Sequence, residues 1–144
     1  MPGYSGTPLM AGYSGTPLSK KLGIKEGQRL AFPGAPAGFG RMLGELPDGV
    51  QVNARAAGPL DVIVFFTTTR RELRHRFDAL KRSLDPAGGL WVAWPKRASG
   101  VPTDLTEDEV REVALERGLV DNKVCAIDET WSGLRFVVSL SDRR

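Results

Sequence analysis

The side chains best suited to hold a ligand stand in two short segments, each at the end of an apolar run. The segment WPKRASG supplies Lys96, Ser99 and Gly100, a cation followed by a flexible turn of the kind that receives anionic groups. The segment AIDETW supplies Asp128 and Trp131, a carboxylate and an amphipathic ring. Ligands of parallel sheets bind beyond the carboxyl ends of the strands, so we predict a site for a small anionic molecule there.

The loop PGAPAGFG is a third candidate, because glycine-rich loops let a backbone approach a phosphate or a nucleoside cofactor. Gly34 and Pro36 are therefore assigned to the same site. The match to a dinucleotide loop is poor, since Pro33 and Pro36 lack a backbone N–H. In addition, Asn53 or Arg55 stands where a ribose-binding carboxylate would be expected. A tight strand-to-helix turn is the alternative interpretation of this loop.

Lys96 is the residue that we most expect to contact a ligand. A structural role stays open beside this one, in which Lys96 pairs with Asp104 or Asp128 and ties its loop down. Strand alternation places Asp128 and Glu129 on opposite faces, so they form no ready acid/base pair. No catalytic residue is assigned on this basis.

Cysteine and histidine offer little material for catalysis or metal binding. Cys125 stands in an apolar strand, where a thiol behaves as a small hydrophobe. The one histidine, His75, stands on the charged side of a helix. A Cys–His dyad needs the two side chains together and a zinc site needs several ligands, so neither is predicted.

The segment RRELRHRFDALKRSL is strongly basic. It predicts a helix whose exposed Arg71 and Arg74 would contact an acidic protein or an RNA backbone. No aromatic side chains interleave with the charges to stack bases, which disfavours nucleic acid as the partner. The alternative is a solvated helix face.

Alternating strands and helices must position these residues. Thr69 with Glu72, and Thr106 with Glu109, have the spacing of capping boxes that begin helices. A Ser132-Gly133 turn is expected to join the last two strands. We predict strands at 29–32, 50–53, 60–66 and 90–94, helices from 39, over 70–84 and over 106–117, and a closing hairpin. This order predicts a three-layer, Rossmann-like α/β fold with a mostly parallel sheet and a C-terminal antiparallel hairpin.

Composition favours one globular domain, because 144 residues with 41% hydrophobic and 26% charged side chains suffice for a single core. We place it at 22–140, between a flexible arm (1–21) and a polar tail (141–144). The arm contains GYSGTPL twice, at 3–9 and 12–18, and only the second copy is expected to belong to the folded protein. One cysteine, no long apolar run and no signal-like start predict a cytoplasmic protein without membrane contact.

Three segments carry a family resemblance: YSGTPLSKKLGIK, LWVAWPKRASGVPTDLTEDEVRE and GLVDNKVCAIDETWSGLRF. Over about 12–138 the chain resembles a bacterial family, the domain of unknown function 3052, which implies no activity, cofactor or catalytic residue. The order of elements also resembles class I methyltransferases. The main functional prediction is a small-ligand-binding or regulatory module. The alternatives are a divergent methyltransferase using S-adenosylmethionine, which this topology implies, and an interaction protein that binds through the basic helix.

Overall fold

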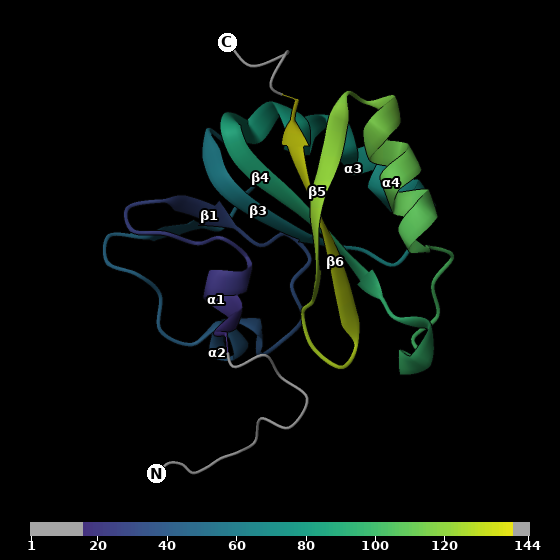
Figure 1. Ribbon diagram of the computed structural model, residues 1–144, viewed down its shortest axis with the longest axis horizontal. Coiled ribbons are helices and arrows are strands. Elements are labelled where there is room, and N and C mark those ends of the chain that lie inside the picture. Colours follow the sequence, from purple (N-terminus) through teal and green to yellow (C-terminus); the bar gives the residue numbers. More distant parts are fainter. Residues whose placement is uncertain (1–15, 140–144) are drawn as a thin grey trace.

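The structure is a computed structural model that describes residues 16–139 of the chain. Its centre is a six-stranded sheet with the strand order β2-β1-β3-β4-β6-β5 (Figure 1). The strands are β1 (Arg29–Ala31), β2 (Gln51–Asn53), β3 (Leu60–Phe66), β4 (Leu84–Pro95), β5 (Leu119–Ala126) and β6 (Trp131–Val138). The first four run parallel, and β6 runs antiparallel to β4 and β5. The predicted mostly parallel sheet with a C-terminal antiparallel hairpin is therefore confirmed.

Helices cover both faces of the sheet and complete the predicted three layers (Figure 1). They are α1 (Leu18–Lys21), α2 (Phe39–Leu43), α3 (Arg70–Ser83) and α4 (Glu107–Glu116), with a short 3-10 turn, η1 (Arg97–Ser99), after β4. The longer α3 and α4 lie on one face, and the short α1 and α2 lie on the other. No helix within residues 16–139 is long and apolar enough to cross a membrane.

The face under α3 and α4 holds the larger part of the core. Leu73, Phe77 and Leu80 form an apolar stripe on α3 and are buried against the sheet. Full burial of a side chain of this kind contributes about 1.5–3 kcal/mol relative to exposure. The stripe therefore fixes the orientation of α3 and turns its basic side chains outward.

Both long helices begin at the predicted capping threonine. The N–H of Glu72 donates to the Thr69 hydroxyl at 3.1 Å, and the N–H of Glu109 donates to the Thr106 hydroxyl at 3.3 Å. Such a cap satisfies a donor that the first turn leaves free and stabilises a helix by about 1 kcal/mol. Since α3 follows β3 and α4 follows β4, both caps lie at the carboxyl edge of the sheet.

The opposite face carries a smaller core, built on Trp91. The indole is fully buried, and its Nε1–H donates to the carbonyl of Leu22 at 2.9 Å. Ile24, Phe39 and Leu43 pack in the same core. Because α1 and α2 are so short, the ends of β1 and β3 on this face are covered largely by the chain's own loops and aromatic side chains.

The folded part begins earlier than predicted. Leu18–Lys21 form helix α1, although the arm was expected to reach residue 21. Leu18 packs against the second core, which gives this end of the chain an apolar anchor. The first GYSGTPL copy, most of the second, and the polar tail lie outside the described residues.

The predicted Ser132-Gly133 turn is wrong. Both residues belong to β6, and residues 127–130 connect the two strands instead. A Cβ on Gly133 would lie 3.1 Å from the side chains of both Ile127 and Trp91, so the glycine serves close packing within a strand.

Strand β4 also begins earlier than predicted, at Leu84 rather than at Leu90. The pairing of β3 with β4 shifts register at this point. A Cβ on Gly88 would meet the Asp61 carbonyl oxygen, and a Cβ on Gly89 would meet the Arg135 side chain. These glycines allow a neighbouring backbone and side chain to approach the strand closely.

Candidate functional site

The predicted site segments follow β1, β4 and β5 and so lie at the carboxyl edge of the sheet (Figure 1). The segment between β1 and α2, residues 32–38, is called the first loop. The N–H of Phe66 donates to the carbonyl of Pro33 at 3.0 Å, which joins the first loop to the end of β3. The N–H of Lys96 donates to the carbonyl of Thr130 at 2.7 Å, which joins the segment after β4 to the hairpin turn. Pro95 lies opposite Trp131 in the antiparallel ladder. The edge thus has two ends, one at the first loop and one at the hairpin.

Lys96 is tied to the hairpin by its side chain as well as by its backbone. Its Nζ donates to the backbone carbonyl of Asp128 at 2.6 Å, and the side chain is half-buried. Asp104, the other partner that we considered, instead accepts the N–H of Arg70 at 2.8 Å. One donor position of the Lys96 ammonium is thereby used. An ammonium group has three N–H donors, so the hydrogen bond to Asp128 leaves two of them for a ligand.

The polar neighbours of Lys96 shape the two loops. The carboxylate of Asp128 accepts the N–H groups of Thr130 at 2.8 Å and Trp131 at 2.7 Å, which closes the hairpin turn. The Ser99 hydroxyl donates to the Lys96 carbonyl at 2.7 Å, and Gly100 ends η1 with a φ of 78°. These residues hold the site's backbone in place, and their role toward a ligand stays a prediction.

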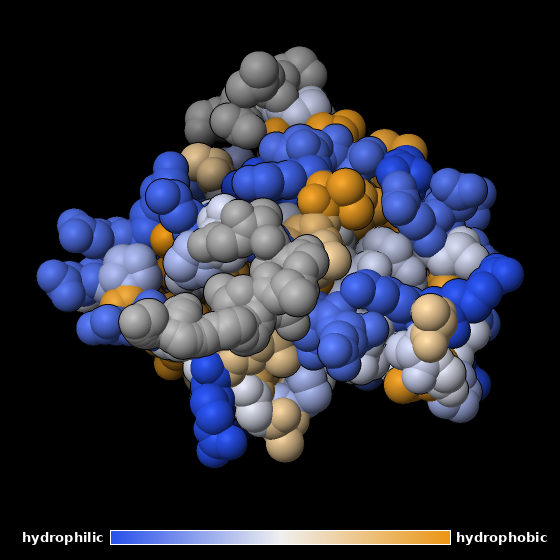
Figure 2. All heavy atoms as spheres, turned by 60° about the horizontal axis from the view of Figure 1, so that its bottom comes forward, coloured by the Kyte–Doolittle hydropathy of each residue, from blue (hydrophilic) through white to orange (hydrophobic). Residues whose placement is uncertain are grey.

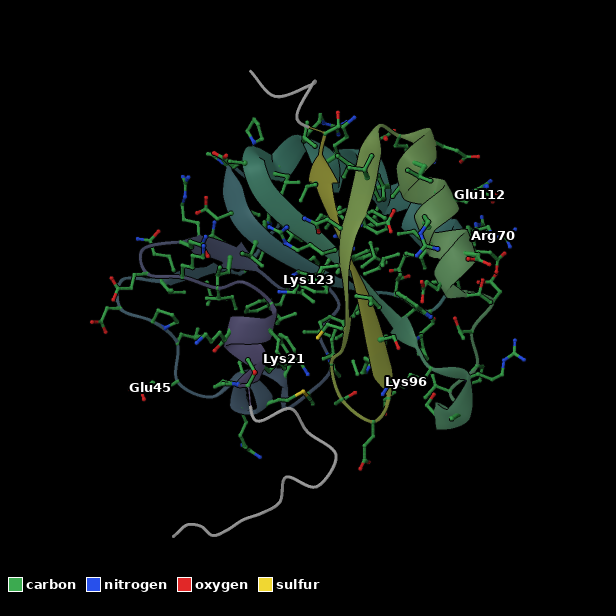
Figure 3. All side chains as sticks on the ribbon, in the orientation of Figure 1. Lys21, Glu45, Arg70, Lys96, Glu112 and Lys123 are labelled. Carbon is green, nitrogen blue, oxygen red and sulfur yellow. The ribbon has the colours of Figure 1, made fainter. Side chains whose placement is uncertain are left out.

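Two further lysines, which we did not predict from the sequence, lie around the hairpin. The Nζ of Lys21 on α1 donates to the carbonyl of Ala126 at 3.3 Å, and Lys123 is exposed on β5. In Figure 3, Lys96 lies beside the turn of the hairpin, Lys21 lies on α1, and Lys123 lies farther along β5, toward the middle of the sheet. We define these three residues as the lysine cluster. No sequence spacing indicates it, because the three elements meet only in the folded chain.

The positive charges of all three lysines act on the thiol of Cys125. Burial raises the pKa of Cys125, and the positive charges of Lys21, Lys123 and Lys96 offset only part of this rise. The thiol is therefore protonated at neutral pH, as the sequence predicted for a buried cysteine. Such a thiol is a poor nucleophile.

The first loop is closed against β3. Gly34 has a φ of 77°, and a Cβ at this position would lie 2.5 Å from the backbone oxygen of Phe66. The N–H of Ala35 donates to the carbonyl of Phe32 at 3.1 Å, and the carbonyl of Pro36 accepts the N–H of Phe39 at 3.1 Å. Gly34 and Pro36 thus belong to a compact strand-to-helix turn. That they also bind a ligand stays a prediction.

A row of four aromatic rings extends from this loop to the hairpin. Phe39 contacts Phe32 and Phe66 with ring centroids 5.1 and 4.9 Å apart, and Phe66 contacts Trp131 at 5.1 Å. Each contact is edge-to-face, the geometry that aromatic pairs favour. Phe39 and Phe66 are buried, and Trp131 is half-buried at the hairpin end.

Helix α3 is less free to bind an acidic partner than its sequence indicates. Arg70 forms an ion pair with Glu109, and Arg74 lies 4.0 Å from Glu116, both on α4. Arg71 is exposed and makes no ion pair with any residue between 16 and 139. The neighbouring acidic helix therefore neutralises part of the basic face, and partner binding through it stays a prediction.

A hollow of ≈ 640 Å³ lies between α1 and the segment that follows α2. Its lining includes Pro17, Ser19, Ile24, Leu43, Gly44 and Pro47, and none of the predicted ligand-binding residues. On the side of the hairpin tip, the visible surface is mostly hydrophilic, with hydrophobic side chains in small separate patches (Figure 2). Among residues 16–139, no three His, Cys, Asp or Glu side chains lie together as metal ligands.

No protein-family model and no curated protein matches the sequence. The resemblance to the domain of unknown function 3052 therefore stays a prediction. Solved structures do match, and several of them are methyltransferases. A SAM dependent methyltransferase from Aquifex aeolicus aligns with a TM-score of 0.59 and 19% identity, over 83% of this chain and 87% of that one.

Two further structures support the same likeness. Precorrin-6y C5,15-methyltransferase from Geobacter metallireducens GS-15 has a TM-score of 0.59 and 11% identity, over 85% of this chain and 86% of that one. Fibrillarin from Aeropyrum pernix, in complex with natively bound S-adenosyl-L-methionine, has a TM-score of 0.54 and 13% identity. The alignment covers 85% of this chain and 69% of that one. Identities this low establish the fold alone. The methyltransferase-like, Rossmann-like topology is confirmed on these grounds.

The residues of the first loop do not fit S-adenosylmethionine, the cofactor that this fold implies. In a dinucleotide fingerprint one glycine lets the backbone approach the cofactor, and the others serve the tight turn and close packing. Gly34 is of the packing kind, because a Cβ there would meet the Phe66 carbonyl. The half-buried Asn53 ends β2, where a carboxylate would bind ribose hydroxyls. We derive no catalytic step through this cofactor.

Proposed function

We propose that this protein is a small-molecule-binding module on a methyltransferase-like fold, and that its ligand carries an anionic group held by the lysine cluster. The observation that carries the proposal is that Lys21 and Lys96 donate to carbonyls of the hairpin from two other segments, and that these two charges and that of Lys123 on β5 all act on the Cys125 thiol. An anionic group bound between these lysines would be attracted by each of their positive charges. The half-buried position of Lys96 strengthens this attraction, because screening by water is weaker there.

The acids of the hairpin turn do not pair with the lysines of the cluster within residues 16–139. The Asp128 carboxylate already accepts two backbone N–H groups, and Glu129 is exposed in the turn. Lys21 and Lys96 donate to neutral carbonyls rather than to carboxylates. Trp131 would supply an apolar surface beside the anionic group. The ligand class that fits is a small phosphorylated or carboxylated molecule with an apolar part.

A phosphate titration tests the proposal directly. Inorganic phosphate would be added to the isotope-labelled protein at low ionic strength while amide shifts are followed by NMR. We expect saturable shifts centred on residues 96–100 and 126–131. Lys96→Gln keeps a donor for the Asp128 carbonyl but removes the charge, and it should weaken binding about fivefold, since one such charge contributes about 1 kcal/mol.

Arg82→Gln provides the matched control, because Arg82 is exposed on α3, which covers the other face of the sheet. It removes the same charge from the protein and should leave the phosphate affinity unchanged. Shifts that spread evenly over the basic surface, or an affinity that Lys96→Gln does not alter, would contradict the proposal.

A second candidate is a divergent methyltransferase that uses S-adenosylmethionine. The observation that favours it is the likeness of the whole fold to methyltransferase structures. The comparisons by themselves favour this candidate, whereas the side chains at the carboxyl edge favour the binding module. Saturable binding of S-adenosylmethionine would decide for the methyltransferase.

A further inference from the structure

We infer that this chain keeps the methyltransferase-like fold but has closed its cofactor position with its own side chains, so that it does not bind S-adenosylmethionine. The inference concerns the first-loop end of the carboxyl edge. It is independent of the lysine cluster, which lies at the hairpin end.

The first observation is the contact between the first loop and β3. In a nucleotide-binding turn, glycine allows the cofactor to approach the backbone. Here the missing Cβ of Gly34 makes room for the Phe66 carbonyl, 2.5 Å from where that Cβ would lie. The N–H of Phe66 binds the carbonyl of Pro33 in the same contact. The glycine thus serves the packing of two chain segments.

The second observation is that three backbone positions of the first loop, Pro33, Ala35 and Pro36, offer no N–H to a ligand. A phosphate or carboxylate held by a loop needs several free N–H groups that point toward it. Pro33 and Pro36 have none, and the N–H of Ala35 is bound to the Phe32 carbonyl. Helix α2 begins at Phe39 and has only five residues, so it adds little dipole.

The third observation is the aromatic row. An adenosine-type ligand would have to enter the crevice between the first loop and the end of β3. Phe39 and Phe66 are only 2% and 3% exposed there, and both lie edge-to-face with their neighbours. To admit a ligand, at least one of these rings would have to leave the core. The hollow between α1 and the segment after α2 is lined by none of the four rings.

Calorimetric titration of the full chain with S-adenosylmethionine, and separately with S-adenosylhomocysteine, tests the inference. We expect no saturable heat up to about 1 mM ligand, and no rise of the melting temperature at that concentration. One-to-one binding with a dissociation constant below about 100 μM would overturn the inference. The phosphate titration tests the lysine cluster and not the first loop. The proposed function and this inference can therefore be contradicted independently.

A pair of glycine variants gives a second readout, which does not depend on a negative result. Gly34 and Gly38 both have a positive φ, but nothing lies within 4 Å of a Cβ on Gly38. If Gly34 serves packing, Gly34→Ala should lower the melting temperature by many degrees more than Gly38→Ala does. Equal melting temperatures for the two variants would overturn the inference.

Discussion

The two ends of the carboxyl edge differ in what fills them. At the first-loop end, Phe39 and Phe66 are buried in edge-to-face contact, and the exposed Gly34 leaves room for the Phe66 carbonyl. At the hairpin end, Lys21 and Lys96 donate to carbonyls of the turn and keep further donor positions. The first-loop end is thus filled by packed rings, and the hairpin end, where Lys21, Lys96 and Lys123 form no ion pair with residues 16–139, is the one that we propose for a ligand.

This difference shows that a chain can keep the order of its strands while the loop that binds a cofactor in other proteins is replaced by packed side chains. The sheet order requires only that β1, β3 and β4 pack side by side, and apolar rings meet that requirement as well as a cofactor-binding loop does. A charged group cannot replace them in the core, because burying an unpaired charge is costly. Ligand binding is therefore expected where the edge stays polar.

The largest effect is expected from Phe39→Ala, which removes the ring between Phe32 and Phe66. The side chain is 2% exposed, so the change leaves a cavity in the second core and should cost about 3–5 kcal/mol of unfolding free energy. Urea denaturation measures this. Phe32→Ala, at the half-buried end of the row, is the control and should cost clearly less. A loss below about 1 kcal/mol for Phe39→Ala would mean that the first-loop end is not a core.

Sequence patterns predicted the strands and helices that depend on residues close together in the chain. The apolar run of β3 and the caps at Thr69 and Thr106 were found because strand burial and capping depend on neighbouring residues. The hairpin turn was misplaced because Ser132-Gly133 has the composition of a turn. Gly133 instead makes room for Trp91, far away in the chain, and nothing in its local sequence reveals that contact.

The same distinction applies to the site. Lys96 was predicted because a cation after a buried strand is visible in the sequence, and the structure places it beside Asp128 and Trp131 at the hairpin. Lys21 was missed because it reaches the hairpin from α1 across the fold, which only tertiary structure reveals. The packing role of Gly34 was missed for the same reason, since its partner is the backbone of β3.

A smaller effect is expected from Lys96→Met at the hairpin end. The change removes the hydrogen bond to the Asp128 carbonyl and should cost about 1 kcal/mol, the usual net contribution of such a bond. Lys123→Met is the matched control, because Lys123 is exposed and should change stability by less than about 0.5 kcal/mol. Urea denaturation of both variants measures the difference. Equal losses would show that the Lys96 contact does not hold the turn.

The smallest effect concerns Cys125, which belongs to the second core and is influenced by the charges of the lysine cluster. Burial raises the pKa of the thiol above its ordinary value of 9.0, so the folded chain holds this proton more tightly than the unfolded chain does. The stabilisation is complete below the unfolded pKa and is lost as the pH rises through the folded pKa. Wild type should therefore lose stability above about pH 9 faster than Cys125→Ser, by at most about 1.4 kcal/mol per pH unit.

The lysine cluster sharpens this last test. Lys123 favours the thiolate, so Lys123→Met should raise the folded pKa of Cys125 further and steepen the alkaline loss. Urea denaturation from pH 7 to about 10.5 compares the three proteins, and lysines common to them cancel in the differences. Parallel curves for wild type and Cys125→Ser would mean that burial does not penalise the thiolate. A curve for Lys123→Met that matches wild type would place this lysine too far from the hairpin core to contribute to a shared anion site.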